Sequence, residues 1–358
     1  MKKNNDKDDT YYKDGAHDIY HHENGQVALR VNFKNGKMDG LVEKFYENGQ
    51  LAGKVTYKNG KEDGISEAFY ENGQLQMRSY YKDDKAEGLM ELFFENGKIW
   101  QRGHNKNGKG EGLAETFHEN GKIETRIHYK NDEKDGLQEE FYENGKRKGR
   151  LYFKNNKKHG IQETFHENGK LASRTHFKNG KAGGPLEIFQ KNGKPETHAN
   201  FEKGKQEGHQ EAFYENGKLK MRSHYKDDKQ EGLQEAFYEN GKLAEKSNYK
   251  NDKQDGVYET FYENGKTKER GNYKNDKIDG LCEKFYENGK PKVCMNLKNG
   301  KKEGLAETFH ENGKRRTRQN YKNDKREGLE ETFAKNGNPE RNFFYKNDEE
   351  VPLPAEYQ

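Results

Sequence analysis

Calcium binding is the first chemistry that the polar residues of this chain suggest. The segment Asn251-Asp252-Lys253-Gln254-Asp255-Gly256 resembles the start of a calcium-binding loop. The third position of such a loop supplies an oxygen ligand, and here that position is Lys253. We therefore interpret the segment as a turn, because Asn, Asp and Gly are the residues that turn backbones prefer.

Histidine is the second residue type that could hold a metal, and the 13 histidines are scattered singly. His118 and His166 occupy the same position two periods apart in a 24-residue repeat that runs through the chain. Two hairpins with strands about 4.8 Å apart separate these positions by about 19 Å. Because metal–nitrogen bonds are about 2 Å long, the two side chains cannot share a metal. We interpret them as aromatic substitutes for tyrosine.

Nucleophilic chemistry has little support. With a two-residue loop between their strands, Cys294 faces Glu283 and the thiols of Cys282 and Cys294 lie on opposite faces, so both cysteines are expected to be reduced. The Asn-Gly pairs lie between strands, whereas a phosphate-binding loop opens a helix. The unusual residues form no recognisable catalytic set: Trp100, His198, His209, Cys282 and Cys294. The chain is predicted not to be an enzyme and to have no catalytic, metal or cofactor site.

A sequence repeat explains the spacing of these residues better than an active site does. A tag of the form Glu-Asn-Gly, first seen at Glu23-Asn24-Gly25, recurs every 24 residues without insertion or deletion. Its glycines are Gly25, Gly49, Gly73, Gly97, Gly121, Gly145, Gly169, Gly193, Gly217, Gly241, Gly265, Gly289, Gly313 and Gly337. A fixed period of this length indicates one supersecondary unit that is stacked many times.

Each copy reads as two strands joined by turns. Asn48-Gly49 between alternating segments predicts a two-residue type I′ hairpin turn, in which both central residues have positive φ. The second turn has only Gly, Asp or Asn at its second central position, for example Gly60 and Asp84, and these residues tolerate the left-handed region. A further glycine, Gly64 in this copy, is interpreted as a bulge or strand-entry position. The fold class is therefore all-β: an elongated single-layer antiparallel meander of stacked hairpins, which strand twist winds into an open superhelix.

The two-residue loop sets a register in which opposed residues of one hairpin have numbers that sum to 97. Glu43 then faces Lys54, Phe45 faces Ala52 and Tyr46 faces Leu51. An acidic row lies beside a basic row, with Phe and Leu/Ile rows on the same face, and this register is expected to stabilise the pairing. The predicted structural ladder includes Glu43, Glu67, Glu91, Arg78, Arg102, Arg126, Phe45, Phe69 and Phe93. The basic row is interrupted at His198, Cys294 and Asn342, the first places to look for local specialisation.

Tyrosine and histidine are expected on the opposite face, together with a second aromatic row that includes Tyr57. The candidate binding face is predicted to contain Tyr46, Tyr70, Tyr142, Tyr214, Tyr238, Tyr262 and Tyr286.

The ends depart from the repeat. Residues 1–15 are predicted to form an irregular N-terminal segment and cap, and residues 16–350 fourteen tandem hairpins. Residues 351–358 are predicted to form a C-terminal tail, because Pro352 and Pro354 block further strand pairing.

Composition narrows the class of partner. Hydrophobic residues are 28% and charged residues 36%, with a mean hydropathy of -1.52, which fits a thin sheet near water on both faces better than a compact core. The net charge of +4 comes from 67 basic and 63 acidic residues that are interspersed, so no nucleic-acid partner is expected. No apolar run of transmembrane length and no signal peptide is visible. The protein is expected in the cytoplasm as the chain stands, and exported or surface-associated if a leader was removed.

The units Phe285-Tyr286-Glu287-Asn288-Gly289-Lys290 and Tyr57 to Ile65 resemble the MORN-repeat variant family, which in bacteria includes YwqK-type antitoxin-like proteins. The resemblance covers roughly residues 16–350. It implies hairpin repeats in an elongated sheet, no catalysis, and roles in protein scaffolding or membrane-associated binding. The antitoxin label implies neutralising a toxin by binding it.

The predicted function is a non-enzymatic scaffold whose partner is a protein, with toxin neutralisation or a host or partner interaction as narrower forms. The alternative is an array that binds cell-surface carbohydrate or a membrane. Carbohydrate-binding arrays typically rely on tryptophan, and this chain has only Trp100. Balanced charge counts against a membrane surface.

Overall fold

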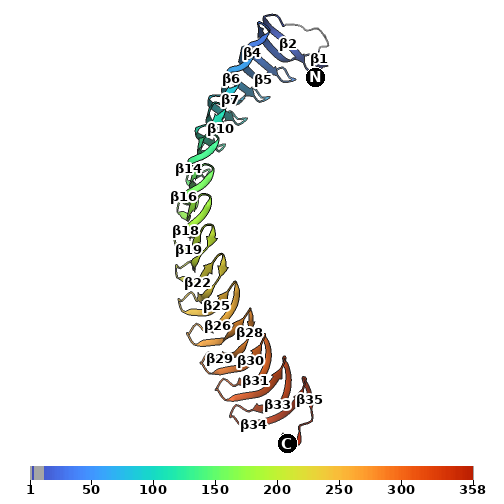
Figure 1. Cartoon of the computed structure of the whole chain (residues 1–358), viewed down its shortest axis with the longest axis vertical. Helices are drawn as coiled ribbons and strands as arrows, with labels where there is room; N and C mark the ends of the chain where they lie inside the picture. The colour runs from blue at the N-terminus through green and yellow to red at the C-terminus, as the bar shows by residue number, and fades with distance from the viewer. Residues whose placement is uncertain (1, 4–11, 358) are drawn as a thin grey trace. The chain divides into compact units, whose positions relative to one another are not determined.

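The structure, a computed structural model, describes residues 2–3 and 12–357 (Figure 1). The chain divides into two units, residues 1–181 and 182–358. As predicted, the fold is all-β, and each unit is a single-layer antiparallel meander in which strands adjacent in sequence pair with one another. None of the described residues forms a helix that is long and apolar enough to cross a membrane.

The strands of the first unit are β1 (Lys2–Lys3), β2 (Gly15–His21), β3 (Val27–Lys34), β4 (Lys37–Phe45), β5 (Leu51–Lys58), β6 (Lys61–Phe69), β7 (Leu75–Lys82), β8 (Lys85–Ala86), β9 (Gly88–Phe93), β10 (Ile99–Lys106), β11 (Lys109–Gly110), β12 (Gly112–Phe117), β13 (Ile123–Lys130), β14 (Glu133–Phe141), β15 (Arg147–Lys154), β16 (Lys157–Phe165) and β17 (Leu171–Lys178).

The remaining elements are β18 (Lys181–Phe189), β19 (Pro195–Glu202), β20 (Lys205–Gln206), β21 (Gly208–Phe213), β22 (Leu219–Lys226), β23 (Lys229–Gln230), β24 (Gly232–Phe237), β25 (Leu243–Lys250), β26 (Lys253–Phe261), β27 (Thr267–Lys274), β28 (Lys277–Ile278), β29 (Gly280–Phe285), β30 (Pro291–Lys298), β31 (Lys301–Phe309), β32 (Arg315–Lys322), β33 (Lys325–Phe333), β34 (Pro339–Lys346), β35 (Glu349–Val351) and the 3-10 helix η1 (Ala355–Tyr357).

The turn at Asn48-Gly49 differs from the predicted type I′ turn. Gly49 has a φ of 82°, but Asn48 is not among the residues with positive φ. The Gly49 N–H donates to the Tyr46 carbonyl at 2.9 Å, and the Tyr46 N–H donates to the Gln50 carbonyl at 2.8 Å. The loop is therefore longer than two residues and ends in a glycine bulge, which is the next most common hairpin connection.

This bulge changes the register next to the turn. Phe45 is opposite Leu51, not Ala52 as predicted, and Tyr46 lies outside both strands. The prediction for the strand centres is correct, because Glu43 is opposite Lys54 and Val42 is opposite Val55. A pairing shift between Phe45 and its preceding residue absorbs the extra loop residue.

The second turn has the predicted type I′ geometry. Asn59 and Gly60 both have positive φ, 51° and 84°, and Lys58 is opposite Lys61. Gly64, at a φ of 132°, lies where the pairing shifts between Val55 and Tyr57. Its predicted role as a bulge is confirmed. In some copies this bulge divides the strand in two, which is why β8 and β9 are separate elements.

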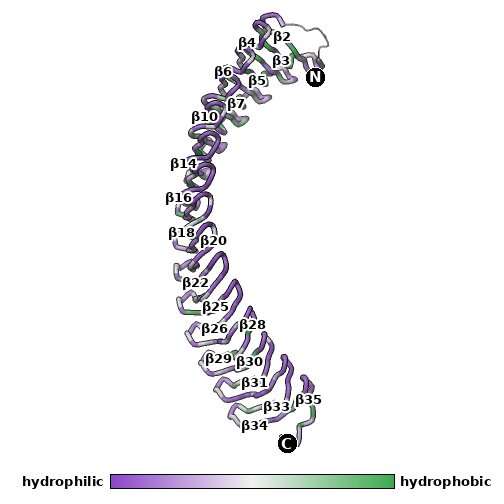
Figure 2. Tube along the Cα trace, in the orientation of Figure 1, coloured by the Kyte–Doolittle hydropathy of each residue, from purple (hydrophilic) through white to green (hydrophobic). Residues whose placement is uncertain are grey.

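The core consists of small residues at the strand centres. Figure 2 shows hydrophilic residues along most of the trace, with hydrophobic residues recurring singly along the strands. On the face opposite Glu43 and Lys54, which we call the core face, buried residues recur at the position of Val55. They are Val31, Ser79, Leu151, Ala199, Ser223, Ser247 and Gln319. Most of these side chains are small, so they fill little space between neighbouring strands of the single layer.

The two ends are partly described. Of the predicted N-terminal segment, residues 1 and 4–11 lie outside the described residues, and β1 pairs with β2 through Lys2 and His21. At the other end, β35 ends at Val351, and Pro352 and Pro354 precede η1.

Candidate functional site

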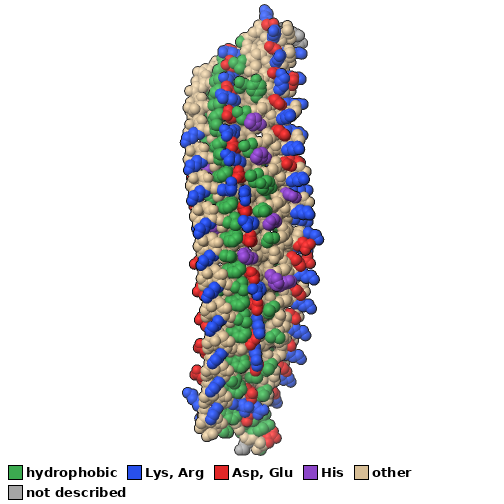
Figure 3. Space-filling view, turned by 90° about the vertical axis from the view of Figure 1, so that its left-hand side faces the viewer, with side chains coloured by type: hydrophobic (Ala, Val, Ile, Leu, Met, Phe, Trp, Pro, Cys, Tyr) green, Lys and Arg blue, Asp and Glu red, His purple; other side chains and the backbone are tan. Residues whose placement is uncertain are grey.

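A ladder of alternating charge runs along one face of each unit, which we call the ladder face. Most basic residues at the strand centres are opposite one glutamate of their own hairpin and one of the next, as Arg102 is opposite Glu91 and Glu115. Alternation along each strand puts the Phe and Leu rows on this same face. Figure 3 shows alternating acidic and basic side chains beside rows of hydrophobic ones, with histidines nearby.

The glutamates of the ladder are held from two sides. Glu115 is 4% exposed and accepts hydrogen bonds from Arg102 Nε at 2.7 Å and from Arg126 Nε at 2.9 Å. Burial raises the pKa of Glu115, but the hydrogen bonds from Arg126 and Arg102 outweigh burial, so the pKa is lowered. Glu67 and Glu163 have the same environment, each between two basic residues, and their pKa values are lowered for the same reasons.

In the first unit, the ion pairs between opposed residues of the ladder form at the glutamates of alternate copies. Glu91 is opposite both Arg78 and Arg102, as the sequence predicted for Arg102. Their guanidinium groups nevertheless pair with Glu67 and Glu115. Among the described residues, Glu91 forms no ion pair, so opposed positions do not by themselves determine which charges meet.

Cations of the ladder also contact the phenylalanine row of the following copy. Arg30 lies over Phe45 and Lys54 over Phe69, each 5.8 Å from the ring centroid. Arg102 lies 5.3 Å from the centroid of Phe117. The predicted ladder residue Phe93 is opposite Ile99 and completes the row.

Aliphatic side chains on the other side of the ladder remain exposed. This row, which we call the aliphatic row, lies two residues before the glutamate of each copy. Its members with exposed fractions from 38% to 57% are Ile65, Leu89, Leu113, Ile161, Leu233, Val257 and Leu281. A hollow of about 370 Å³ lies between Ile65, Tyr80 and Leu89. The sequence predicted this row but gave no sign that it stays uncovered.

The predicted binding-face tyrosines connect successive hairpins. All seven hydroxyls donate to a phenylalanine carbonyl in the next copy, such as Tyr46 to Phe69 at 2.6 Å and Tyr238 to Phe261 at 2.6 Å. His118 Nε2 makes the same contact with the carbonyl of Phe141 at 3.1 Å. The hydroxyls are therefore occupied within the protein, and a role for these tyrosines in binding a partner stays a prediction.

Turn residues supply further contacts between copies that sequence reasoning missed. Asp276, at the second turn, accepts a hydrogen bond from the Gln254 N–H at 2.8 Å. Asp255 accepts one from the Asn275 N–H at 3.3 Å. Lys266 Nζ donates to the Asn288 carbonyl at 2.8 Å. The sequence did contain a signal for these contacts: Asp recurs at the second turn, where glycine would adopt the left-handed conformation more easily.

Two neighbouring copies share a distinct buried cluster on the core face. Tyr258 is 5% exposed and Cys282 is 1% exposed. The Tyr258 hydroxyl donates to Glu269 at 2.8 Å and lies 3.5 Å from the Cys282 sulfur. Burial raises the pKa of both Tyr258 and Cys282. The Tyr258 ring fills the space above Gly271, where a Cβ would lie 2.8 Å from a ring carbon. This cluster is therefore interpreted as local packing.

At the breaks in the basic row, the carboxylates face residues other than Lys or Arg. Cys294 is opposite both Glu283 and Glu307, and burial, with both carboxylates, raises the pKa of its thiol. Both cysteines are free, as predicted. His198 packs edge-on against Phe213, with ring centroids 5.0 Å apart. In the described part of the chain, no group of three or more His, Cys, Asp or Glu residues is arranged to hold a metal.

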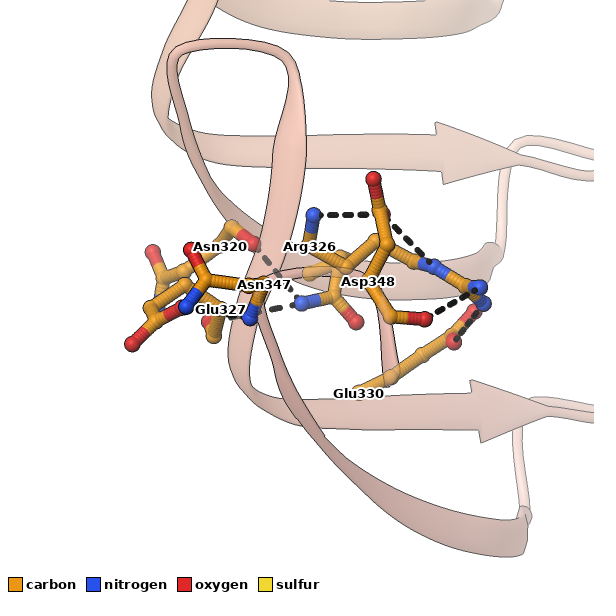
Figure 4. A network of polar contacts seen from close by, with 7 residues as sticks. Asn320, Arg326, Glu327, Glu330, Asn347 and Asp348 are labelled. Atoms are coloured by element: carbon orange, nitrogen blue, oxygen red, sulfur yellow. Dashed lines mark hydrogen bonds and ion pairs between the residues drawn. The ribbon is translucent and has the colours of Figure 1, made fainter. Parts of the chain in front are cut away.

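A polar network holds the last hairpins together (Figure 4). Arg326 lies 3.7 Å from the ring centroid of Tyr345 and pairs with Asp348 at 3.4 Å and Glu330 at 3.8 Å. The Arg326 N–H donates to Asp348 at 2.7 Å, and the Asn347 N–H donates to Glu327 at 3.0 Å. These contacts repeat the turn contacts of the other copies.

Solved structures with detectable similarity share little of this chain's geometry. A chain in "Crystal Structure of TcdB2-TccC3" is 10% identical, with a TM-score of 0.17 over 90% of this chain and 20% of its own length. One in "Crystal Structure of TcdB2-TccC3-TEV" is 11% identical, with a TM-score of 0.17 over 91% of this chain and 16% of its own. This chain thus spans about a fifth or less of their length. Such low TM-scores support no argument about function. No curated protein matches the chain.

The family described as MORN repeat variant matches most of the repeat array. The matched residues are 38–59, 62–83, 86–107, 110–131, 134–155, 158–179, 206–227, 230–251, 254–275, 278–299 and 302–323. The intervening copy, which contains Pro185, Pro195 and His198, is not matched. Because these segments cover well over half of the sequence, the chain belongs to the MORN repeat variant family.

Proposed function

We propose that this protein is a non-enzymatic scaffold that binds a protein partner along its ladder face. The observation that carries the proposal is the aliphatic row, in which one exposed Leu, Ile or Val recurs in successive copies. Aligned apolar side chains on an otherwise polar surface are typical of interaction sites. Covering them stabilises a complex by about 25 cal/mol per Å² of apolar area.

The charge ladder is better suited to orienting a bound partner than to providing affinity for it. Some of its glutamates are paired with two cations each. The cations themselves are 40% to 50% exposed at Arg78, Arg126 and Arg270. Exposed ion pairs contribute about 0 to 1 kcal/mol. A fixed alternation of charge nevertheless disfavours partners that would place like charges opposite the ladder. Electrostatics contributes to specificity in this way.

The test compares the aliphatic row with the tyrosines in the same hairpins. A triple variant, Leu233→Ser, Val257→Ser and Leu281→Ser, removes three exposed members of the row. Intact protein and variants are used to capture partners from the source cells, and the captured proteins are identified by mass spectrometry. We expect one dominant protein that the intact chain retains and the triple variant loses, at nearly unchanged thermal stability.

Two controls distinguish the loss of a binding surface from a loss of fold stability. Lys229→Ser, Lys253→Ser and Lys277→Ser change exposed residues that directly follow turns of the same hairpins, and this variant should retain the partner. Tyr238→Phe removes only the hydroxyl that bonds to Phe261, which should lower stability by about 1 kcal/mol and leave capture intact. Loss of the partner in Tyr238→Phe, with retention in the triple variant, would move the binding surface to the tyrosines.

Carbohydrate binding is the second candidate because large aromatic side chains, among them Tyr80, Trp100 and Tyr152, are exposed in the first unit. Tyr80, Trp100 and Tyr152 are 51%, 44% and 48% exposed, and their flat apolar rings suit stacking on sugars. A glycan-binding screen of the intact chain, with Trp100→Ala and Tyr152→Ala as variants, tests this candidate. Binding that these changes abolish would favour it.

Toxin neutralisation is a narrower form of the protein-binding proposal. It requires that the captured partner harm cells when expressed alone and that co-expression of this chain restore growth. A membrane-associated role would instead give sedimentation with liposomes.

A further inference from the structure

We propose that His209 and His224 form a two-nitrogen site for a divalent transition-metal ion on the ladder face of the second unit. The two residues are directly opposite each other, His209 on β21 and His224 on β22. Their ring centroids are 5.1 Å apart and the ring planes are inclined by 77°. This inference does not depend on the proposed partner binding.

The distance between the rings suits a shared metal. Imidazole nitrogens bind such ions at about 2.0 to 2.1 Å. Two imidazoles on one ion, at bond angles between about 90° and 109°, then have centroids about 4.5 to 5.2 Å apart. The observed 5.1 Å falls within this range. A shared ion further requires rotation about the side-chain bonds that points one nitrogen of each ring at it.

This pairing of histidines is peculiar to one hairpin among those described. From β4 onward, each of the other copies has a member of the aliphatic row or another nonpolar residue at the position of His209, so a histidine at the position of His224 has no imidazole opposite it. The corresponding pairs include Leu89 with His104, Leu113 with His128, Ile161 with His176, Leu233 with Asn248 and Val257 with Asn272.

Both imidazoles are available as ligands. His209 is exposed and His224 is half-buried. Neither ring takes part in a hydrogen bond or ion pair among the described residues; each contacts the other ring. Glu211, two residues after His209 on the same strand face, is paired with Arg222 at 3.0 Å. The protein therefore supplies two nitrogen ligands, and water completes the coordination.

The ligand type selects the metal. Imidazole suits Cu²⁺, Ni²⁺ and Zn²⁺, whereas Mg²⁺ and Ca²⁺ prefer oxygen ligands. Since the imidazoles must be deprotonated to bind, affinity falls as the solution becomes acidic.

The test titrates the intact chain with Ni²⁺ by isothermal calorimetry at neutral pH. Two variants restore residues that other copies carry at the same positions: His209→Leu, as in Leu233, and His224→Asn, as in Asn248. Because other hairpins fold with these residues, the backbone should tolerate both changes. Controls are His104→Asn and His128→Asn, which remove single histidines opposite leucine.

We expect one Ni²⁺ site whose affinity falls at least tenfold in His209→Leu and in His224→Asn and is unchanged in both controls. Paramagnetic Ni²⁺ should also broaden the NMR signals of β21 and β22 before those of other strands. The proposal is overturned if the intact chain does not bind Ni²⁺, if either variant keeps the full affinity, or if the controls lose as much. A thermal unfolding curve for each variant confirms that any loss belongs to the site.

Discussion

At the scale of single residues, the same side chain has different roles in neighbouring copies. Glu115 accepts hydrogen bonds from two arginines, while Glu91, one copy earlier, forms no ion pair among the described residues. Both are opposite two basic residues. Which glutamate is paired depends on the rotamers of long arginine side chains. The repeat thus contains its own matched control for the energetic contribution of one ladder carboxylate.

Protonation of Glu115 in acid should destabilise the fold more than protonation of Glu91. Burial raises the pKa of Glu115, but the hydrogen bonds from Arg126 and Arg102 lower it by more, so the folded pKa lies below the unfolded pKa. A carboxyl with a lowered folded pKa stabilises the fold above its unfolded pKa, about 4.3 for Glu. That contribution is lost as the pH falls through the folded pKa.

We therefore expect Glu115→Gln to lower the free energy of unfolding at pH 7 by about 1 to 3 kcal/mol, between the values for exposed and buried pairs. The difference from the unmodified chain should shrink below about pH 4. Urea unfolding at several pH values measures it. Glu91→Gln should change the free energy of unfolding much less at every pH. Equal effects of the two substitutions would mean that the ladder does not discriminate between copies.

At the scale of the hairpin, backbone conformation separates two kinds of glycine. Gly265, in the first turn of its copy, has a φ of 90°, and a Cβ there would meet nothing within 4 Å. Gly183, in β18, also has open space for a Cβ, but its φ is not positive. Substitution by alanine at these two positions differs mainly in backbone strain.

Gly265→Ala should destabilise the protein by about 1 to 2 kcal/mol, because an L-residue in the left-handed region costs about that much. Gly183→Ala should be neutral or stabilise by up to about 1 kcal/mol, because alanine reduces the entropy of the unfolded chain. Thermal unfolding of both variants measures the contrast. A stabilising Gly265→Ala would contradict the observed turn conformation.

The two turns also indicate what sequence can predict. The strand pattern, the bulge at Gly64 and the type I′ turn at Asn59-Gly60 follow from local preferences, and the structure contains them. Asn48-Gly49 has the same dipeptide but a different turn, in which Tyr46 is placed to reach the carbonyl of Phe69. That contact joins separate hairpins, so no local rule contains it. For the same reason, the sequence could list the aliphatic row but could not indicate that it stays exposed.

At the scale of the whole molecule, each hairpin contacts mainly its neighbours, so the length of the array is adjustable. The stability of such proteins is approximately a sum over repeats and their interfaces. Removing a whole period joins strands that already have compatible residues. Removing half a period joins strands that do not, because acidic and basic strands alternate, as Glu235 on β24 lies between Arg222 on β22 and Lys246 on β25.

Deletion of residues 231–254, one period of 24 residues, should therefore leave a folded meander. Gln230 would then precede Asp255, as Gln254 does in the intact chain, and the bulge and ladder would continue in register. We expect the strand signal in circular dichroism to be retained and the thermal midpoint to fall by a few degrees at most. If binding is spread over the aliphatic row, partner affinity should fall gradually as further periods are removed.

Deletion of residues 231–242 is the matched control, since it removes β24 with Glu235 and brings the basic strand β25 beside β22. Arg222 then loses its carboxylate partner on that side, and every later strand runs in the opposite sense. This variant should lose cooperative unfolding or aggregate, because the charge pattern no longer specifies the register. If both deletions fold equally well, the ladder does not set the register. If the whole-period deletion alone abolishes partner binding, the contact belongs to one copy and not to the repeated row.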